Sequence, residues 1–239
     1  MRVIIPAAGV GSRLLPLTKL YPKGLVQVGG KPLLMHTMEL LYKAGVSEVI
    51  CVSGYQADFL EQVVESWDKR PSVHFVRNEY YQSTNSIFSL SLTRPWWDED
   101  FIVIDSDVYI KSSLLRCLMN QPGNCLAIDN TKTSDEIDMK VQLRDGLIWH
   151  MDKEMPRSLI SGEFFGLSRW TVNGSNYLSQ MIDRLLEAGH TNVWYEFAIR
   201  DAAKNMPILP VFTDSSQWLE IDTTNDLEKA ELSFAKNQK

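Results

Sequence analysis

A glycine-rich turn near the amino terminus limits what the chain can fold into more than any other feature. A short apolar run at residues 3–5 leads into residues 9–34, which read GVGSRLLPLTKLYPKGLVQVGGKPLL. The first two glycines of this stretch permit a tight turn that brings backbone N–H groups against an anion. Arg13 and Lys23 add positive charge close by. The pattern predicts a phosphate-handling loop at the end of the first strand.

Two commoner glycine-loop motifs do not fit this stretch. The dinucleotide fingerprint G-x-G-x-x-G has Leu14 at its third glycine, and no obvious acidic residue stands about 20 positions further on to hold a ribose. The ATPase loop G-x-x-x-x-G-K-[ST] would need glycine in place of Leu25. Lys31 is followed by Pro32 and not by a hydroxyl that could bind magnesium. The loop is therefore expected to bind phosphates in another way.

The motif A-A-G-x-G-S-R-L-x-P-L-T, followed by P-K and then V-x-G-K-P-L-L, resembles the signature of nucleotidyltransferases that activate phosphorylated metabolites with a nucleoside triphosphate. Four later segments are similar to the small cytidylyltransferases that use phosphocholine, 2-aminoethylphosphonate or related molecules. They are NEYYQSTNSIFSLSL (78–92), VIDSDVYI (103–110), SGEFFGLS (161–168) and WLEIDTTNDLEKA (218–230). The resemblance covers nearly the whole chain. It implies a Rossmann-like three-layer nucleotidyltransferase fold with a mixed, mostly parallel central sheet.

Strand-like and helix-like segments alternate in the first half of the chain, which is α/β order. The expected strands are 3–5, 48–53, 73–76 and 101–104, and the expected helices are 33–44, 57–67 and 86–92. The later segments are expected as strands 125–128, 140–143, 162–167 and 208–212, with helices at about 176–188, at 196–204 and after 226. Ligands are expected at the carboxyl ends of the strands.

Composition and charge limit the domain organisation and the partners. The chain has 239 residues, of which 44% are hydrophobic, and no linker-like segment, so one domain over 1–239 is expected. Residues 1–110 would mainly bind the nucleotide and 111–239 the acceptor. A net charge of −6 with scattered Lys and Arg argues against a nucleic acid partner.

Cysteine usage and hydropathy bear on location. Cys51, Cys117 and Cys125 have neither zinc-ligand spacing nor a disulfide pattern, which predicts buried thiols in a reducing cytoplasm. No apolar run has the length needed to cross a bilayer, so no membrane partner is expected. The sequence does not determine the oligomeric state, and a homo-oligomer is left open.

Two acidic residues follow the apolar strand at 101–104. Asp105 and Asp107 alternate along the chain and are expected to project in the same direction. Mg²⁺ prefers one or two carboxylates together with phosphate oxygens and waters, and Asp222 is the candidate for a second acid. The resemblance implies that Asp107 and Asp222 hold Mg²⁺, and Asp105 is assigned to nucleotide binding.

The resemblance also implies roles for the basic and small residues. Lys23 would contact the phosphate groups, including that of the acceptor, and Arg13 the leaving pyrophosphate, so these two are the catalytic candidates. The segment 83–86 reads equally well as the cap of the following helix and as a nucleotide contact. The nucleotide-binding candidates are Ala7, Ala8, Gly9, Gly11, Ser12, Arg13, Gly54, Tyr55, Thr84, Asn85, Ser86 and Asp105.

Acidic and aromatic residues of the second half are candidates for the acceptor. A cationic amine would be held by carboxylates or by aromatic faces, and Glu163, Trp194 and Glu196 offer both, beside Lys23. Core packing is the alternative for the aromatic residues. Asp135 and Glu136 could also bind an amine, although a solvated loop is expected there. The four histidines are scattered, and no catalytic role is expected for them.

The sequence thus predicts a magnesium-dependent cytidylyltransferase. An anionic phosphate or phosphonate oxygen would attack the α-phosphorus of CTP and expel pyrophosphate, and no general base is needed. A sugar-1-phosphate nucleotidyltransferase using UTP, dTTP or GTP would share every phosphate-site residue and is the alternative. A non-catalytic nucleotide sensor is a second alternative, but it would be expected to have lost the metal acids or the lysine.

Overall fold

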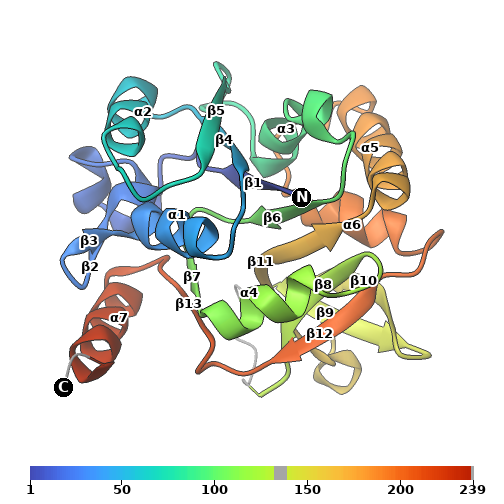
Figure 1. The fold of residues 1–239 in the computed structure, drawn as a ribbon. Helices are drawn as coiled ribbons and strands as arrows, with labels where there is room; N and C mark the ends of the chain where they lie inside the picture. Colours follow the sequence, from blue (N-terminus) through green and yellow to red (C-terminus); the bar gives the residue numbers. More distant parts are fainter. Residues whose placement is uncertain (132–138, 238–239) are drawn as a thin grey trace.

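Helices cover both faces of a nine-stranded sheet in the computed structural model, which describes residues 1–131 and 139–237 (Figure 1). The strands are ordered β10-β9-β11-β6-β1-β4-β5, with β8 paired to β11 and β12 to β8. β1, β4, β5 and β6 are mutually parallel, whereas β11 runs antiparallel to β6, β8 and β9. The mixed α/β sheet expected from the sequence is confirmed. Its strands are β1 (Arg2–Pro6), β4 (Glu48–Ser53), β5 (Ser72–Arg77), β6 (Phe101–Ile104), β8 (Cys125–Asp129), β9 (Met139–Arg144), β10 (Leu147–Asp152), β11 (Gly162–Trp170) and β12 (Leu209–Thr213).

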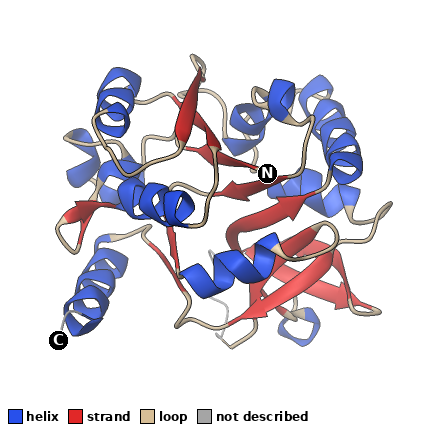
Figure 2. Cartoon of the chain, viewed as in Figure 1, coloured by secondary structure: helices blue, strands red, loops and turns tan. Residues whose placement is uncertain are grey.

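The helices form an outer layer on each face of the sheet (Figure 2). One layer holds α1 (Leu33–Lys43), α2 (Ala57–Glu65) and α4 (Ser112–Met119), and the other holds α3 (Ser86–Ser91), α5 (Val172–Glu187) and α6 (Glu196–Ala202). Because side chains alternate along a strand, Val3 and Ile5 of β1 pack under the first layer and Ile4 under the second. Full burial of each such side chain contributes about 1.5–3 kcal/mol. Within the described ranges, no helix is both long enough and apolar enough to cross a membrane.

Two small ribbons and the last helix stand beside the main sheet (Figure 1). β2 (Gln27–Val28) pairs with β3 (Lys31–Pro32), and β7 (Val108–Ile110) pairs with β13 (Trp218–Glu220). α7 (Thr224–Asn237) packs against the first ribbon, and its Phe234 ring lies 4.9 Å, centroid to centroid, from both His36 and Tyr109. The second ribbon brings two segments that are far apart in the sequence side by side. Short 3₁₀ turns lie at Ser12–Leu14, Leu17–Lys19, Lys23–Leu25, Arg94–Trp96 and Arg157–Leu159.

The structure differs from the sequence-based expectation in several elements. Both ribbons, α4 and β10 were not predicted. α5 begins at Val172, four residues before the predicted start, because Thr171 Oγ1 accepts the Gly174 N–H at 3.1 Å and so caps a turn-like segment. The prediction of buried thiols holds for Cys51 and Cys125, but it is wrong for Cys117, which α4 presents to solvent.

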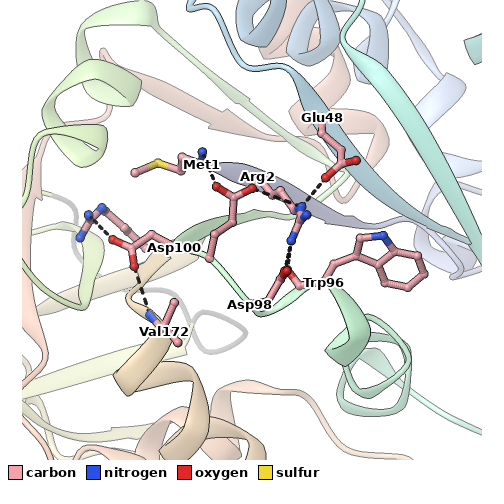
Figure 3. Close-up of polar contacts among 9 residues, drawn as sticks. Met1, Arg2, Glu48, Trp96, Asp98, Asp100 and Val172 are labelled. Atoms are coloured by element: carbon pink, nitrogen blue, oxygen red, sulfur yellow. Dashed lines mark hydrogen bonds and ion pairs between the residues drawn. The ribbon is translucent and has the colours of Figure 1, made fainter.

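Ion pairs join the amino ends of the central strands (Figure 3). The Arg2 guanidinium contacts Glu48 and Asp98, and its Nη1 donates to the Trp96 carbonyl at 3.1 Å. Asp100 accepts from the Val172 N–H at 3.1 Å and from Arg169 Nη2 at 2.9 Å. These contacts fasten β1, β4, β6 and the start of α5 together at the end of the sheet opposite to the cavity described below.

Candidate active site

A cavity of about 690 Å³ opens at the carboxyl ends of β1 and β6, where the sequence analysis expects ligands. The glycine loop and the turn after β6 form one side of it. Residues of β11, the start of α6 and β13 form the other side. The cavity therefore lies where residues from both halves of the chain meet.

The glycine loop has a backbone that requires glycine at position 11. Gly11 has φ +67°, and a β-carbon added there would lie 2.9 Å from Lys23 Cβ. The Thr18 hydroxyl donates to the Gly11 carbonyl at 3.0 Å and fixes the turn. Because the turn packs directly against the stem of Lys23, the conformation of Gly11 also sets where the lysine lies.

Two basic residues of the loop face acidic residues from elsewhere in the chain. The Lys23 ammonium contacts the carboxylates of Asp107 and Asp222. Arg13 Nη1 lies 2.6 Å from Asp222 Oδ2, and the Arg13 side chain is half exposed. Burial of Lys23 disfavours its charge, but Asp107 and Asp222 outweigh that effect and raise its pKa. Lys23 is therefore a fixed cation at any pH near neutrality.

Three carboxylates form a cluster that could hold a metal ion. One oxygen each from Asp107, Glu220 and Asp222 lies within 4.8 Å of the others. Burial, followed by the charges of Asp107 and Asp222, raises the pKa of Glu220 to about 8. Such hard oxygen donors suit Mg²⁺, which accepts few carboxylates and completes its shell with phosphates and waters. Glu220 was missed from the sequence, and no local signal marks it, because it joins the cluster through the pairing of β13 with β7.

Asp105 and Asp107 both line the cavity, and they contact different partners. β6 ends at Ile104, and residues 105–107 form a turn in which the Val108 N–H donates to the Asp105 carbonyl at 3.2 Å. Because these residues lie outside the strand, the alternation of strand side chains does not determine where Asp105 and Asp107 point. The Tyr195 hydroxyl donates to Asp105 Oδ1 at 3.2 Å. Burial and the nearby acids raise the pKa of Asp105 well above its ordinary value.

Gly166 in β11 makes room for Asp105. It has φ +83°, and a β-carbon added there would lie 2.3 Å from Asp105 Oδ2. Asp105 in turn donates its backbone N–H to the Gly166 carbonyl at 2.9 Å. The aspartate is thus held tightly between Gly166 and Tyr195.

Most of the nucleotide-binding candidates lie on the cavity wall, and three support it from behind. The Ala7 N–H donates to the Val52 carbonyl at 2.8 Å, and the Tyr55 N–H donates to the Ala8 carbonyl at 3.0 Å. Gly54 lines a smaller neighbouring cavity. The candidates on the main wall are Ala8, Gly9, Gly11, Ser12, Arg13, Thr84, Asn85, Ser86 and Asp105.

The segment 83–86 both caps a helix and lines the cavity. Asn85 Oδ1 accepts the Ser86 N–H at 2.8 Å at the start of α3, and Ser86 Oγ accepts the Tyr195 N–H at 3.1 Å. Asn78, which the sequence analysis did not select, is buried beneath this segment and lines the cavity too. Its Nδ2 donates to Thr84 Oγ1 at 3.1 Å and so positions the wall.

The acceptor candidates Glu163, Trp194 and Glu196 line the same cavity as Lys23. Burial raises the pKa of Glu196 to about 7. Lys153, also missed from the sequence, places its ammonium 3.9 Å from the centroid of the Trp194 ring. Asp135 and Glu136 lie outside the described residues. The four histidines are all described, and they are not among the residues that line the cavity.

Two aromatic rings close one part of the cavity wall. Trp218 stacks on Phe165 with ring centroids 4.0 Å apart and planes 10° from parallel. Its Nε1 donates to the buried carboxylate of Asp129 at 2.9 Å. Trp218 is the first residue of β13, so the stack positions the strand that carries Glu220.

Comparison with known proteins gives matches over the whole chain. Residues 2–122 match the family model described as nucleotidyl transferase. The choline-phosphate cytidylyltransferase of Streptococcus pneumoniae is 27% identical over 97% of each chain. The CMP-5'-(3-aminopropyl)phosphonate synthase of Streptomyces rubellomurinus is 32% identical over 51% of this chain and 19% of its own length. The solved structure of CTP:phosphocholine cytidylyltransferase from Streptococcus pneumoniae superposes with a TM-score of 0.77 at 23% identity, over 97% of each chain.

Proposed function

The chain belongs to the nucleotidyl transferase family, and we propose that it is a magnesium-dependent cytidylyltransferase. It would transfer CMP from CTP to a small phosphorylated or phosphonate acceptor of the phosphocholine or 2-aminoethylphosphonate type, with release of pyrophosphate. The two curated relatives support the cytidylyl group and this acceptor class, because one is named for cytidylyl transfer to choline phosphate and the other for a CMP-linked aminopropylphosphonate. The choice of CTP over other nucleoside triphosphates is part of the proposal.

One observation carries the proposal. Lys23 and Arg13 of the glycine loop converge with the cluster of Asp107, Glu220 and Asp222 in a single cavity. Two phosphorus-bearing anions repel each other, and fixed cations together with a divalent ion are what overcome that repulsion. A site of this composition suits nucleotidyl transfer and needs no histidine or serine nucleophile.

Different residues of the cavity would bind the triphosphate, the acceptor phosphate and Mg²⁺. Backbone N–H groups of the loop around Gly9 and Gly11 would hold the triphosphate, while Arg13 would stabilise the leaving pyrophosphate. Lys23 would hold the acceptor phosphate against the α-phosphorus. A bound Mg²⁺ would neutralise phosphate oxygens, with Asp107 and Asp222, joined by Glu220, as its protein ligands. No residue has to remove a proton, because the attacking oxygen is already anionic.

The same assignment divides the chain into two regions of one domain. Residues 1–110 would mainly hold the nucleotide, and 111–239 would mainly hold the acceptor through Glu163, Trp194 and Glu196. Glu220 and Asp222 are exceptions, because the pairing of β13 with β7 brings them from the second region to Asp107. The free state of the three cysteines supports the cytoplasmic location that we propose.

A pyrophosphate-release assay tests this function. CTP, UTP, dTTP and GTP are each combined with phosphocholine, phosphoethanolamine, 2-aminoethylphosphonate and hexose 1-phosphates, with and without Mg²⁺. We expect release with CTP and an amine-bearing acceptor only when Mg²⁺ is present. A faster reaction of UTP or dTTP with a hexose 1-phosphate would favour the sugar-nucleotide alternative and overturn the proposal.

Two variants locate the reaction in the described cavity. Lys23→Ala and Asp107→Ala are expected to lower kcat by a factor of about 100 or more, because each removes charge that faces the transferred phosphoryl group. Lys69→Ala is the matched control, since this lysine is exposed and is not among the residues that line the cavity. Near-normal rates in either cavity variant would remove that residue from the mechanism.

A further inference from the structure

The cavity is lined by more acidic than basic side chains. Among its described lining residues, carboxylates outnumber Lys and Arg by seven to four. The positive charge of a divalent ion at the Asp107 cluster would be offset largely by the phosphate oxygens that it binds. The carboxylate of Glu196, which lines the same cavity, would still gain from a further cation. That charge can come from the ligand.

Glu196 has an oxygen that lacks a hydrogen-bond donor. Its Oε2 is shielded from water and has no hydrogen-bond partner among the described residues. Lys153 is near enough to favour its ionisation, but the Lys153 ammonium lies over Trp194 and forms no ion pair with Glu196 within 4.0 Å in the described structure. A carboxylate can turn about its last side-chain bond, so either oxygen can accept from a group in the cavity.

The acceptor end lies close to the phosphate end. Lys23 and Glu196 line the same cavity, and Tyr195, the residue before Glu196, donates its hydroxyl at 3.2 Å to Asp105, two residues before the Asp107 that contacts Lys23. A short molecule can therefore place a phosphate at Lys23 and a cation at Glu196 in the same cavity.

Three of the aromatic rings that line the cavity, those of Phe165, Trp194 and Trp218, are already engaged. Quaternary ammonium groups, which have no N–H, are held mainly by open aromatic faces. Here Trp218 is stacked on Phe165, and the face of Trp194 carries the Lys153 ammonium. A trimethylammonium group at Trp194 would meet that like charge.

We propose that the acceptor is an amine with at least one N–H, held by a charge-assisted hydrogen bond to Glu196, and that the site discriminates against a trimethylammonium group. This inference rests on the proposed function and narrows its acceptor class to phosphoethanolamine-like or aminoalkylphosphonate-like molecules. The hydrogen bond, and not the charge alone, selects the acceptor.

A methylation series separates charge from hydrogen bonding. Phosphoethanolamine and its N-methyl, N,N-dimethyl and N,N,N-trimethyl forms all carry one positive charge, but they offer three, two, one and no N–H groups. We expect kcat/KM with CTP to fall by about 10- to 100-fold at the last methylation, when the final N–H is lost. A trimethyl acceptor that equals or exceeds the dimethyl one would overturn this inference and leave the cytidylyltransferase proposal standing.

Glu196→Gln tests the residue itself. We expect the KM for phosphoethanolamine to rise about 10-fold or more, the KM for CTP to stay within about twofold, and the step at the last methylation to shrink. Glu187→Gln, at the exposed end of α5, is the matched control. An unchanged acceptor KM and an unchanged methylation step in Glu196→Gln would refute the assignment. Absence of pyrophosphate release with every acceptor and every nucleoside triphosphate would refute the proposed function, and this inference with it.

Discussion

The buried carboxylate of Glu196 makes the stability of the ligand-free protein depend on pH. Its pKa is raised, mainly by burial, from the ordinary value of 4.5 to about 7. The unfolded chain therefore releases this proton at a lower pH than the folded protein does. Because the folded state binds the proton more tightly, the free energy of unfolding falls as pH rises from about 4.5 to 7 and then levels off. At roughly 1.4 kcal/mol per pKa unit, the full loss of unfolding free energy is about 3.5 kcal/mol.

Urea denaturation of wild type and Glu196→Gln at pH 5 and pH 8 measures this cost. Between these two values, linkage gives a loss of about 2.5 kcal/mol that is specific to Glu196. The variant, which cannot ionise at this position, should lose about that much less stability than wild type on going to pH 8. Glu187→Gln, whose side chain is exposed, should follow wild type. If Glu196→Gln and wild type lose equal stability between the two pH values, the reasoning from burial is refuted.

Three further predictions concern contacts around the cavity. Gly166→Ala should lower the free energy of unfolding by about 3 kcal/mol in urea titrations, because the alanine would have a positive φ and its β-carbon would clash with Asp105. A decrease of less than about 1 kcal/mol would contradict this prediction. Lys23→Met should show a larger rise in Tm on addition of MgCl₂ than wild type, since the lysine no longer competes with Mg²⁺ for the carboxylates of Asp107 and Asp222. An equal or smaller rise in Tm would count against that competition. Trp218→Phe should lower the free energy of unfolding by about 1–3 kcal/mol in urea titrations, because the buried Asp129 loses a hydrogen-bond donor while the ring stack is kept. An unchanged free energy of unfolding would show that this hydrogen bond does not stabilise the fold.

Local sequence patterns were sufficient for the parts of the fold whose causes are local. The apolar strand before Asp105 and the glycine turn at Gly11 can each be predicted from a few neighbouring residues, and both form as expected. The resemblance drew attention to Lys23, which does lie beside the acids.

Long-range packing accounts for what the sequence could not reveal. Lys153 enters the cavity because β10 folds back along β9, and nothing in its neighbourhood in the chain marks it. Glu220 joins the acidic cluster only because β13 pairs with β7, two strands too short to show a period. The turn that separates the contacts of Asp105 and Asp107 also depends on β11, since Gly166 packs against it.

The pairing of β7 with β13 has a consequence for biosynthesis. A nascent chain that has left the ribosome only as far as residue 200 already contains the glycine turn and Lys23, but it lacks the strand that delivers Glu220 and Asp222. Such an intermediate cannot assemble the proposed cation site, however well its early strands have folded. On the proposed function, catalytic competence therefore arrives late in translation, after the final ribbon has closed.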